Sequence, residues 1–370
     1  MVERRQIVEL WRRGEACVLT TVIEVEGSSY RRPGARLLVA GSGDYAGTIS
    51  GGCLEAEVVR KAAWKVRDGA VLERYSTMFD DTAEIPYGLG CGGVVDLLLE
   101  PVDTPECEAL LLAIERSLSG EQRTVITWLP GEGKTLSRVI LGEDGMPIFA
   151  SRDLPEKKLL CARGLRPGQV YEGRFVEELL PPQRLIVFGA GDDARPLVAM
   201  AAMMGWQVTV ADGRSQLART ERFPEAHSVV SLEAGKVHSL SIHAKDAAVV
   251  MTHSYEQDRS LLAMLLQIAP RYLGLLGARH RSSLLVSEAA TMAGLPLETC
   301  CERIWAPVGL DLGGEGPEAI ALAIIAEVQA ACMGKRGSSR HLSVQDVARY
   351  VGEGGNERYL KRQCATDLAL

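Results

Sequence analysis

The run Gly189-Ala190-Gly191-Asp192-Asp193-Ala194 constrains the fold more than any other stretch of the chain. It directly follows an apolar run at residues 185–188, which is typical of a buried strand, and it opens a helix predicted over residues 194–204. In a G-x-G-x-x-A turn the first glycine allows the tight bend, and the second lets the backbone approach a pyrophosphate. The small last residue permits close helix packing. The run therefore predicts a βαβ unit of the dinucleotide-binding type.

Strands and helices alternate after this turn. Strands are predicted over residues 207–211, 247–252 and 272–276, and helices over residues 256–267 and 282–293. Such alternation is typical of a parallel sheet with right-handed crossovers, as in a Rossmann-like domain. A final apolar helix, predicted over residues 317–333, is expected to pack on that sheet.

The part of the chain before Pro181-Pro182 has a mixed α+β character. Helices are predicted over residues 2–13, 54–68 and 106–118, and strands over 16–26, 35–40, 71–78, 94–102, 124–129 and 136–141. The fold class is therefore α/β, with an N-terminal mixed α+β domain at residues 1–180 and a Rossmann-like parallel-sheet domain at residues 181–333. Residues 334–370 are expected to form a loosely held tail with a short helix at 344–351.

Composition excludes several classes of protein. A chain of 370 residues with 46% hydrophobic and 24% charged residues has enough material for two folded domains. Its formal net charge of −7 supplies no basic field, which argues against nucleic acid or an anionic membrane as a partner. No apolar run approaches the roughly 18 residues of a spanning helix, and no apolar signal core opens the chain. We therefore expect a cytoplasmic protein without a membrane span.

The nine cysteines have neither the spacing of a disulfide scaffold nor that of an iron–sulfur protein. No C-x-x-C pair and no ferredoxin-like triplet occurs among them, so the chain is not expected to carry its own iron–sulfur cluster. Without a secretory signal, the cysteines should be thiols in the cell.

Two of these cysteines are embedded in glycines, as Gly51-Gly52-Cys53 and as Gly90-Cys91-Gly92-Gly93. Adjacent glycines let a thiol stand in an open loop and let a large ligand approach the backbone. Cys53 also lies at the start of a predicted helix, whose dipole favours the thiolate form. The alternative is that each cysteine is a small buried filler in a tight turn. The pair favours a shared site in which Cys53 and Cys91 lie close together, flanked by Gly52 and Gly92.

The glycine turn and Asp212 together suggest a nucleotide site. Asp212 ends the next predicted strand, 23 positions after Gly189, near the spacing of the acid that holds a ribose hydroxyl. Asp192 and its neighbour Asp193 lie in the first helical turn, where they complement the helix dipole but repel an incoming pyrophosphate. The turn therefore predicts either weak NAD(P) binding through Gly189 and Gly191 or a domain that altered or lost its ligand.

Two further groups follow predicted strands of the same sheet. His253 follows the strand at 247–252, and Arg279-His280-Arg281 follows the strand at 272–276. Parallel sheets bind ligands at the carboxyl ends of their strands. His253 is therefore a candidate base or ligand contact, and Arg279 is a candidate anion contact. The alternatives are a histidine that bonds within its own loop and a solvated basic loop.

Taken in order, these segments resemble the XdhC/CoxI family, which comprises accessory proteins for xanthine dehydrogenase and related molybdenum hydroxylases. The residues that carry the resemblance in the first domain are Gly27-Ser28, Pro33-Gly34-Ala35-Arg36, Gly47-Thr48-Ile49-Ser50-Gly51-Gly52-Cys53-Leu54-Glu55 and Gly90-Cys91-Gly92-Gly93. In the second domain they are Phe188-Gly189-Ala190-Gly191, Val250-Met251-Thr252-His253, Gly274-Leu275-Leu276-Gly277-Ala278-Arg279 and Ala306-Pro307-Val308-Gly309-Leu310-Asp311-Leu312-Gly313.

The resemblance implies an accessory chaperone more than an independent enzyme. Such a protein binds molybdenum cofactor (molybdopterin), assists its sulfuration by a sulfurase partner, and delivers it to an apo molybdenum hydroxylase. Cys53 and Cys91 become the candidates for the cofactor site, and a homodimer is an expected assembly. One departure is Asp192, which stands where the family commonly has histidine. The competing hypothesis is an NAD(P)-dependent oxidoreductase that uses the Rossmann-like domain.

Overall fold

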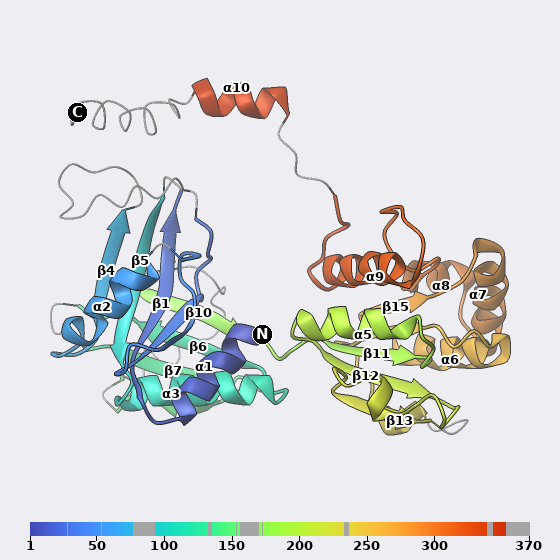
Figure 1. Ribbon diagram of the computed structural model, residues 1–370, viewed down its shortest axis with the longest axis horizontal. Coiled ribbons are helices and arrows are strands. Elements are labelled where there is room, and N and C mark those ends of the chain that lie inside the picture. Colours follow the sequence, from blue (N-terminus) through green and yellow to red (C-terminus); the bar gives the residue numbers. More distant parts are fainter. Residues whose placement is uncertain are drawn as a thin grey trace. The chain divides into compact units, whose positions relative to one another are not determined.

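The computed structural model describes residues 1–27, 29–52, 54–76, 93–131, 135–152, 154–155, 170–171, 173–232, 237–338 and 343–352. The chain divides into two compact units, Val2–Pro181 and Pro182–Arg340, each considered by itself (Figure 1). We call them the first unit and the second unit. The α/β fold class predicted from the sequence is confirmed, because the first unit is mixed α+β and the second contains a parallel sheet.

Two antiparallel sheets form the first unit in the described part of the chain. Sheet A has the order β3 (Tyr45–Gly47), β2 (Arg36–Ala40), β1 (Ala16–Glu26), β5 (Val94–Pro101) and β4 (Val71–Ser76). Sheet B has the order β8 (Pro147–Ala150), β7 (Ser137–Leu141), β6 (Arg123–Trp128), β10 (Arg174–Leu179) and β9 (Val170–Tyr171). The strands predicted over residues 16–26, 35–40, 124–129 and 136–141 are confirmed and form the antiparallel pairs β1–β2 and β6–β7, whereas β3, β8, β9 and β10 were not predicted.

Within the described residues of this unit, three helices cover the sheets. Helices α1 (Val2–Arg12) and α3 (Pro105–Leu118) share one core with both sheets, and Leu19 of β1 and Ile140 of β7 both contribute to it. Helix α2 (Glu55–Lys65) packs on the other face of sheet A, against Val18 and Val22. Because successive residues of a strand point to opposite faces, Val18 and Leu19 supply one side chain to each core.

A buried ion pair joins the two sheets. Arg138 of β7 and Glu100 of β5 are both almost completely buried, and Nη1 and Nη2 of the arginine lie 2.8 and 3.1 Å from the two carboxylate oxygens. Arg138 Nε also donates to Thr127 Oγ1 at 3.0 Å, and Nη1 donates to the carbonyl oxygen of Glu106 at 2.6 Å. The pair is therefore fully hydrogen-bonded, as a charge in a protein core must be.

The second unit is built on a six-stranded parallel sheet. The order is β13 (Ser228–Ser231), β12 (Gln207–Asp212), β11 (Arg184–Phe188), β14 (Ala247–Val250), β15 (Tyr272–Leu275) and β16 (Ile304–Trp305). Numbered within the unit, this is 3-2-1-4-5-6, the order of a Rossmann fold with its switch point between β11 and β14. Two 3₁₀ turns, η1 (Thr220–Arg222) and η2 (Val237–Leu240), flank β13.

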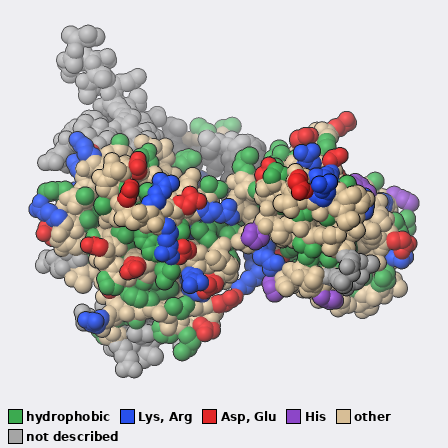
Figure 2. All heavy atoms as spheres, turned by 60° about the horizontal axis from the view of Figure 1, so that its bottom comes forward, with side chains coloured by type: hydrophobic (Ala, Val, Ile, Leu, Met, Phe, Trp, Pro, Cys, Tyr) green, Lys and Arg blue, Asp and Glu red, His purple; other side chains and the backbone are tan. Residues whose placement is uncertain are grey.

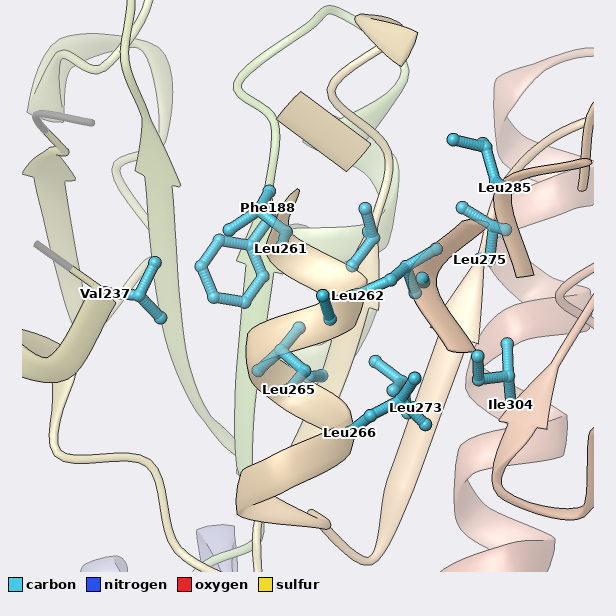
Figure 3. Packing of buried hydrophobic residues seen from close by; sticks show 14 of the residues in the cluster. Phe188, Val237, Leu261, Leu262, Leu265, Leu266, Leu273, Leu275, Leu285 and Ile304 are labelled. Atoms are coloured by element: carbon cyan, nitrogen blue, oxygen red, sulfur yellow. The ribbon is translucent and has the colours of Figure 1, made fainter. Parts of the chain in front are cut away.

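Helices cover both faces of this sheet. Helices α5 (Ala194–Met203) and α9 (Pro317–Cys332) pack on one face, with Leu197 and Ile324 in the same core. Helices α6 (Tyr255–Ile268) and α7 (Arg279–Ala293) pack on the other face, and α8 (Leu297–Arg303) follows α7. Figure 3 shows that second core, in which Leu262 and Leu266 of α6 lie near Leu273 of β15. The prediction that the last long helix packs on the sheet is confirmed.

A short helix, α10 (Val344–Gly352), lies in the C-terminal segment at the predicted position. Among the residues that the structure describes, no helix is long and apolar enough to cross a membrane. On the face seen in Figure 2, basic and acidic side chains are interspersed within each unit.

Candidate functional site

The carboxyl edge of the parallel sheet brings together most of the second unit's candidate residues. Gly189 and Gly191 follow β11, Asp212 ends β12, and His253 follows β14. Since parallel strands end at the same edge, side chains from three neighbouring strands converge there. Arg279 begins α7 after β15 and is exposed.

The glycine turn has the shape that its sequence predicts. Gly189 has a φ of +121°, and a Cβ at this position would lie 2.3 Å from the carbonyl oxygen of Met251. Only glycine fits so close to β14. At Gly191 the neighbour is different, because a Cβ there would lie 2.3 Å from Asp193 Oδ1. The Asp193 carboxylate therefore lies over the turn, in the region through which a pyrophosphate would pass.

Asp212 is buried, and its carboxylate holds the turn. One oxygen, Oδ2, accepts from the backbone N–H of Ala190 and from Arg214 Nη2, both at 2.7 Å. The other, Oδ1, accepts from the backbone N–H and Nε of Arg214 at 2.8 and 3.0 Å. Burial would raise the pKa of Asp212, but the hydrogen bonds from Arg214 and Ala190 outweigh it and lower the pKa. The ionised carboxylate of Asp212 therefore accepts hydrogen bonds from the glycine turn and from Arg214. The sequence had predicted instead an acid that is free to hold a ribose hydroxyl.

Both acids of the turn have cationic or titratable partners. Asp192 Oδ1 lies 2.7 Å from Arg222 Nη2, and Nη1 of the same arginine donates to the carbonyl oxygen of Ala190 at 2.6 Å. Asp193 Oδ2 lies 2.8 Å from His253 Nε2. His253 has a φ of +65°, so a strained backbone presents its ring to the glycine turn. The Asp193–His253 contact bridges β11 and β14 at the topological switch point.

The basic cluster after β15 has a structural contact of its own. Arg281 Nη2 lies 2.6 Å from Oδ2 of Asp258, a fully buried acid whose other oxygen accepts from the backbone N–H and the hydroxyl of Thr252. This network fixes the start of α6 to the start of α7. Of the cluster, Arg281 is therefore a structural residue, while Arg279 remains exposed at the edge.

A cavity of 890 Å³ lies beside the ends of β11 and β12. Its walls are the side chains of α6, the end of α7 and the segments after β12 and β13. Figure 3 shows Phe188 and Val237, two of its apolar residues, pointing toward one another beside α6. Asp212 and Arg214 stand in its wall. Arg214 was not predicted as a site residue, although its place two residues after Asp212 was a usable signal.

In the first unit, Glu55 organises the loop that precedes Cys53. Its buried carboxylate accepts from the backbone N–H groups of Ile49, Ser50 and Gly52 at 3.0, 2.9 and 2.9 Å, and from the hydroxyls of Thr48 and Ser50. Burial alone would raise the pKa of Glu55, but these hydrogen bonds prevail and lower it to about 2.

The two glycines of this loop differ in their surroundings, and only Gly52 has open space beside it. Gly51 has a φ of +85°, and a Cβ there would lie 2.8 Å from the ring of Tyr30, which comes from the loop after β1. Gly52 has a φ of +114°, and a Cβ there would meet no atom within 4 Å. The backbone beside Cys53 is therefore accessible to a large ligand. Cys53, Cys91 and Gly92 themselves lie outside the described residues.

Strand pairing gives the strands that precede the two cysteine segments a common direction in sheet A. Gly47, at the end of β3, pairs with Leu37 near the start of β2, whose Arg36 pairs with Thr21. Val94, at the start of β5, pairs with Glu26 at the end of β1 and with Ser76 at the end of β4. Strands β3 and β4, which precede these segments, therefore run in the same direction as β1 (Figure 1), but Gly47 lies level with Thr20 of β1, six residues before Glu26, with which Val94 pairs.

The loop before Cys53 has an exposed backbone at Gly52. Within the described ranges, no group of three or more His, Cys, Asp or Glu side chains is arranged to hold a metal. The accessible backbone at Gly52 leaves space that a side chain would fill, and thiolates are suitable donors for a soft metal or a sulfur centre.

The sequence matches two family models, one described as "XdhC and CoxI family" at residues 10–76 and one as "XdhC Rossmann domain" at residues 185–328. The chain is 29% identical over 320 residues to a Bacillus subtilis protein named as a probable subunit of xanthine dehydrogenase, covering 85% of this chain and 92% of the relative. It is 26% identical over 329 residues to the molybdenum cofactor insertion chaperone PaoD of Escherichia coli, covering 88% and 86%.

A solved structure extends the likeness to three dimensions. The crystal structure of a protein named a xanthine dehydrogenase, from Bacillus halodurans, is 28% identical to this chain and superposes with a TM-score of 0.76. The match covers 91% of this chain and 98% of that one.

Proposed function

Because the chain belongs to the XdhC and CoxI family, we propose that it is an accessory protein that binds molybdenum cofactor and inserts it into a molybdenum hydroxylase. The relative named a molybdenum cofactor insertion chaperone supports this role along most of the length of the chain. When bound, the cofactor supplies the molybdenum centre that the hydroxylase uses. The tasks of this chain are to bind it, to exclude unwanted reactants and to release it.

The observation that carries the proposal is that β3 and β4 run in the same direction in sheet A. This common direction supports a site to which the segments after these strands, with Cys53 and Cys91, both contribute. Glu55 fixes one of these segments, and Gly52 leaves its backbone accessible. We assign Cys53 and Cys91, with Gly52 and Gly92, to a shared cofactor site. A thiolate at Cys53, just before helix α2, would serve as a soft ligand.

The proposal extends to partners of stated kinds. An apo molybdenum hydroxylase of the xanthine dehydrogenase type receives the cofactor, and a sulfurase supplies sulfur to it while the chain protects it. A homodimer is the assembly that we propose for the accessory protein itself.

Substitution of the cysteines tests the site. Cys53→Ser and Cys91→Ser variants, purified from a molybdenum-replete host, should retain much less pterin and molybdenum than the parent protein. The matched control is Cys17→Ser, because Cys17 is an exposed free thiol at the start of β1. All three variants should melt within a few degrees of the parent. Full cofactor retention by both Cys53→Ser and Cys91→Ser would refute the site.

A second candidate function is that of an NAD(P)-dependent oxidoreductase. The strand order and the glycine turn favour it. Two contacts speak against ordinary dinucleotide binding, since Asp212 is engaged by Arg214 and Asp193 lies over the turn. Parallel titrations of the pure protein with NADH and with molybdopterin separate the two functions. We expect tight binding of the pterin and weak binding of NADH.

A further inference from the structure

We propose that Tyr30 is the stacking residue of the cofactor site and that the flat pyrimidine ring of the pterin lies on its exposed side chain. This inference rests on the proposed cofactor role and adds to it a residue of the loop between β1 and β2. It assigns the pterin end of the cofactor to Tyr30 and its glycine neighbours, whereas a cysteine thiolate would serve the metal end.

The loop between β1 and β2 is fixed close to Tyr30. At its base, the backbone N–H of Gly34 donates to the carbonyl oxygen of Val22 at 2.8 Å. Arg31, the residue after Tyr30, forms an ion pair with Glu3 of helix α1. Because Arg31 and Gly34 both follow Tyr30 closely, these contacts restrain the backbone that carries the tyrosine.

The side chain of Tyr30 reaches from its own loop to the loop before Cys53. A Cβ on Gly51 would lie 2.8 Å from Cδ1 of Tyr30 and 3.2 Å from Cε1 and Cγ, so the ring lies directly against the backbone there. Tyr30 is nevertheless 73% exposed. Beside the ring, a Cβ on Gly52 would meet no described atom within 4 Å. An aromatic ring that packs on one side and borders open space on the other is a suitable surface for stacking.

Exposure alone would not distinguish Tyr30, since Tyr45 of β3 is 54% exposed as well. What distinguishes Tyr30 is the contact with Gly51, which lies in the loop that Glu55 holds. The carboxylate of Glu55 accepts a hydrogen bond from the backbone N–H of Gly52 at 2.9 Å, so the backbone beside the ring is fixed. A restrained ring against a restrained backbone loses little conformational freedom when a ligand stacks on it.

The polar groups of the neighbouring backbone also suit a pterin. The N–H groups of Gly51 and Gly52 already donate to Thr48 and Glu55. Among the described residues, no hydrogen bond reaches the carbonyl oxygens of these two glycines, so the backbone offers acceptors to a ligand. The pyrimidine edge of a pterin carries an amino group and a ring N–H, which are donors. Stacking uses the face of the ring and leaves these donors free for the backbone.

Fluorescence titration of the full chain with hydroxymethylpterin tests the proposal. This probe has the flat ring but neither a dithiolene nor a metal, so it reports the stacking contact alone. Tyr30→Leu, which removes the aromatic ring, should weaken binding by about 10-fold or more, whereas Tyr30→Phe should bind within about twofold of the parent. The matched control is Tyr45→Leu, which removes another exposed tyrosine of the same unit and should leave binding unchanged.

The outcomes separate this inference from the cofactor role itself. Cys53→Ser should bind the probe like the parent, because the probe carries no group for a thiolate. Unchanged binding by Tyr30→Leu with an intact melting transition, or no binding by the parent, would overturn the stacking assignment and leave the cysteine test of the cofactor role as it stands. If the parent binds the probe through Tyr30 but retains no cofactor from a molybdenum-replete host, the cofactor role fails and the pterin contact remains.

Discussion

At the scale of single residues, Glu55 shows how one carboxylate can define a loop. Five donors from residues 48–52 converge on it, while the backbone N–H of Gly51 donates to Thr48 Oγ1. A glutamate at this position has the sequence signature of an ordinary first-turn acid of a helix. The role of Glu55 can be recognised only in the folded structure, where residues 48–52 lie next to its carboxylate.

Replacing Glu55 by Gln should destabilise the protein in a pH-dependent way. The folded pKa of about 2 is below the ordinary value, so the ionised acid stabilises the fold above about pH 4.5 and loses this effect as the pH falls toward 2. With allowance for screening by nearby solvent, we expect a loss of about 2 kcal/mol at pH 7. Thermal melting of parent and variant between pH 7 and pH 3 should show their melting temperatures converging at the acid end.

The control for this measurement is Glu73→Gln. Glu73 pairs with Lys65 at the partly exposed side of α2 and holds no loop. It should produce a smaller and less pH-dependent change. A constant offset between the parent and Glu55→Gln at every pH would contradict the assignment.

At the scale of elements, Glu100 and Arg138 connect two sheets through one buried contact. Glu100→Gln would leave the arginine charge uncompensated in the core, and we expect a loss of about 3–5 kcal/mol in the free energy of unfolding by urea. The double variant Glu100→Leu with Arg138→Met should recover most of that loss. Glu26→Gln, which breaks the exposed pair with Arg74 on the same sheet, should leave the free energy of unfolding nearly unchanged.

The glycine turn carries a second prediction at this scale. Asp193→Ser removes the carboxylate that lies over Gly191 and should strengthen binding of ADP, a pyrophosphate probe, by about 10-fold, equivalent to about 1.4 kcal/mol. Asp192→Asn should give a smaller gain, because the Asp192 side chain is 85% exposed and is already paired with Arg222. Calorimetry measures the affinity for ADP of the parent protein, of Asp193→Ser and of Asp192→Asn. A larger gain from Asp192→Asn than from Asp193→Ser would show that net charge, not position, controls access.

The elements that sequence reasoning predicted are those with strong local patterns. Strands β11, β12, β14 and β15 are apolar runs flanked by helices, and all four were predicted. Strand β13 has only four residues, none of them fully buried, and β16 has only two residues, so neither has a pattern long enough to detect. Strand β10 contains Glu177 and Glu178, and Glu177 is buried only because distant Arg36 pairs with it. Pairing at that sequence distance has no local signature.

The candidate site was predicted to a similar degree. The glycine turn and the positions of Asp212 and His253 at the sheet edge followed from the βαβ pattern. The side-chain partners of these residues could not be predicted. Arg222 contacts the glycine turn and Asp193 contacts His253 through side-chain conformations that sequence spacing does not determine. The cavity was also missed, since its walls come from five separate segments of the chain.

At the scale of the whole molecule, the second unit should fold by itself. A fragment of residues 182–338 contains the complete parallel sheet and the helices on both of its faces. We expect it to unfold in one cooperative transition, measured by circular dichroism in urea. A fragment that begins at residue 190 lacks β11, the strand between β12 and β14, and should not fold. If neither fragment folds, the units are not independent domains.

The whole chain should also lack dehydrogenase turnover of its own. It has no spacing for iron–sulfur ligands, and the exposed His253 is bonded to Asp193. Steady-state assays of cofactor-free protein with purines or aldehydes and NAD should therefore give background rates. Robust NAD reduction would favour the oxidoreductase hypothesis instead.

The passage of the chain from one unit to the other between Pro181 and Pro182 has a consequence for affinity. A molecule held by one unit stays tethered near the other, so a second contact becomes intramolecular, with an effective concentration on the order of millimolar for a short linker. A second contact with a dissociation constant of about 1 mM would then be roughly half formed. Neither unit therefore needs a high affinity of its own for the complex to persist. Weak separate contacts also dissociate quickly, which suits the cofactor transfer that we propose.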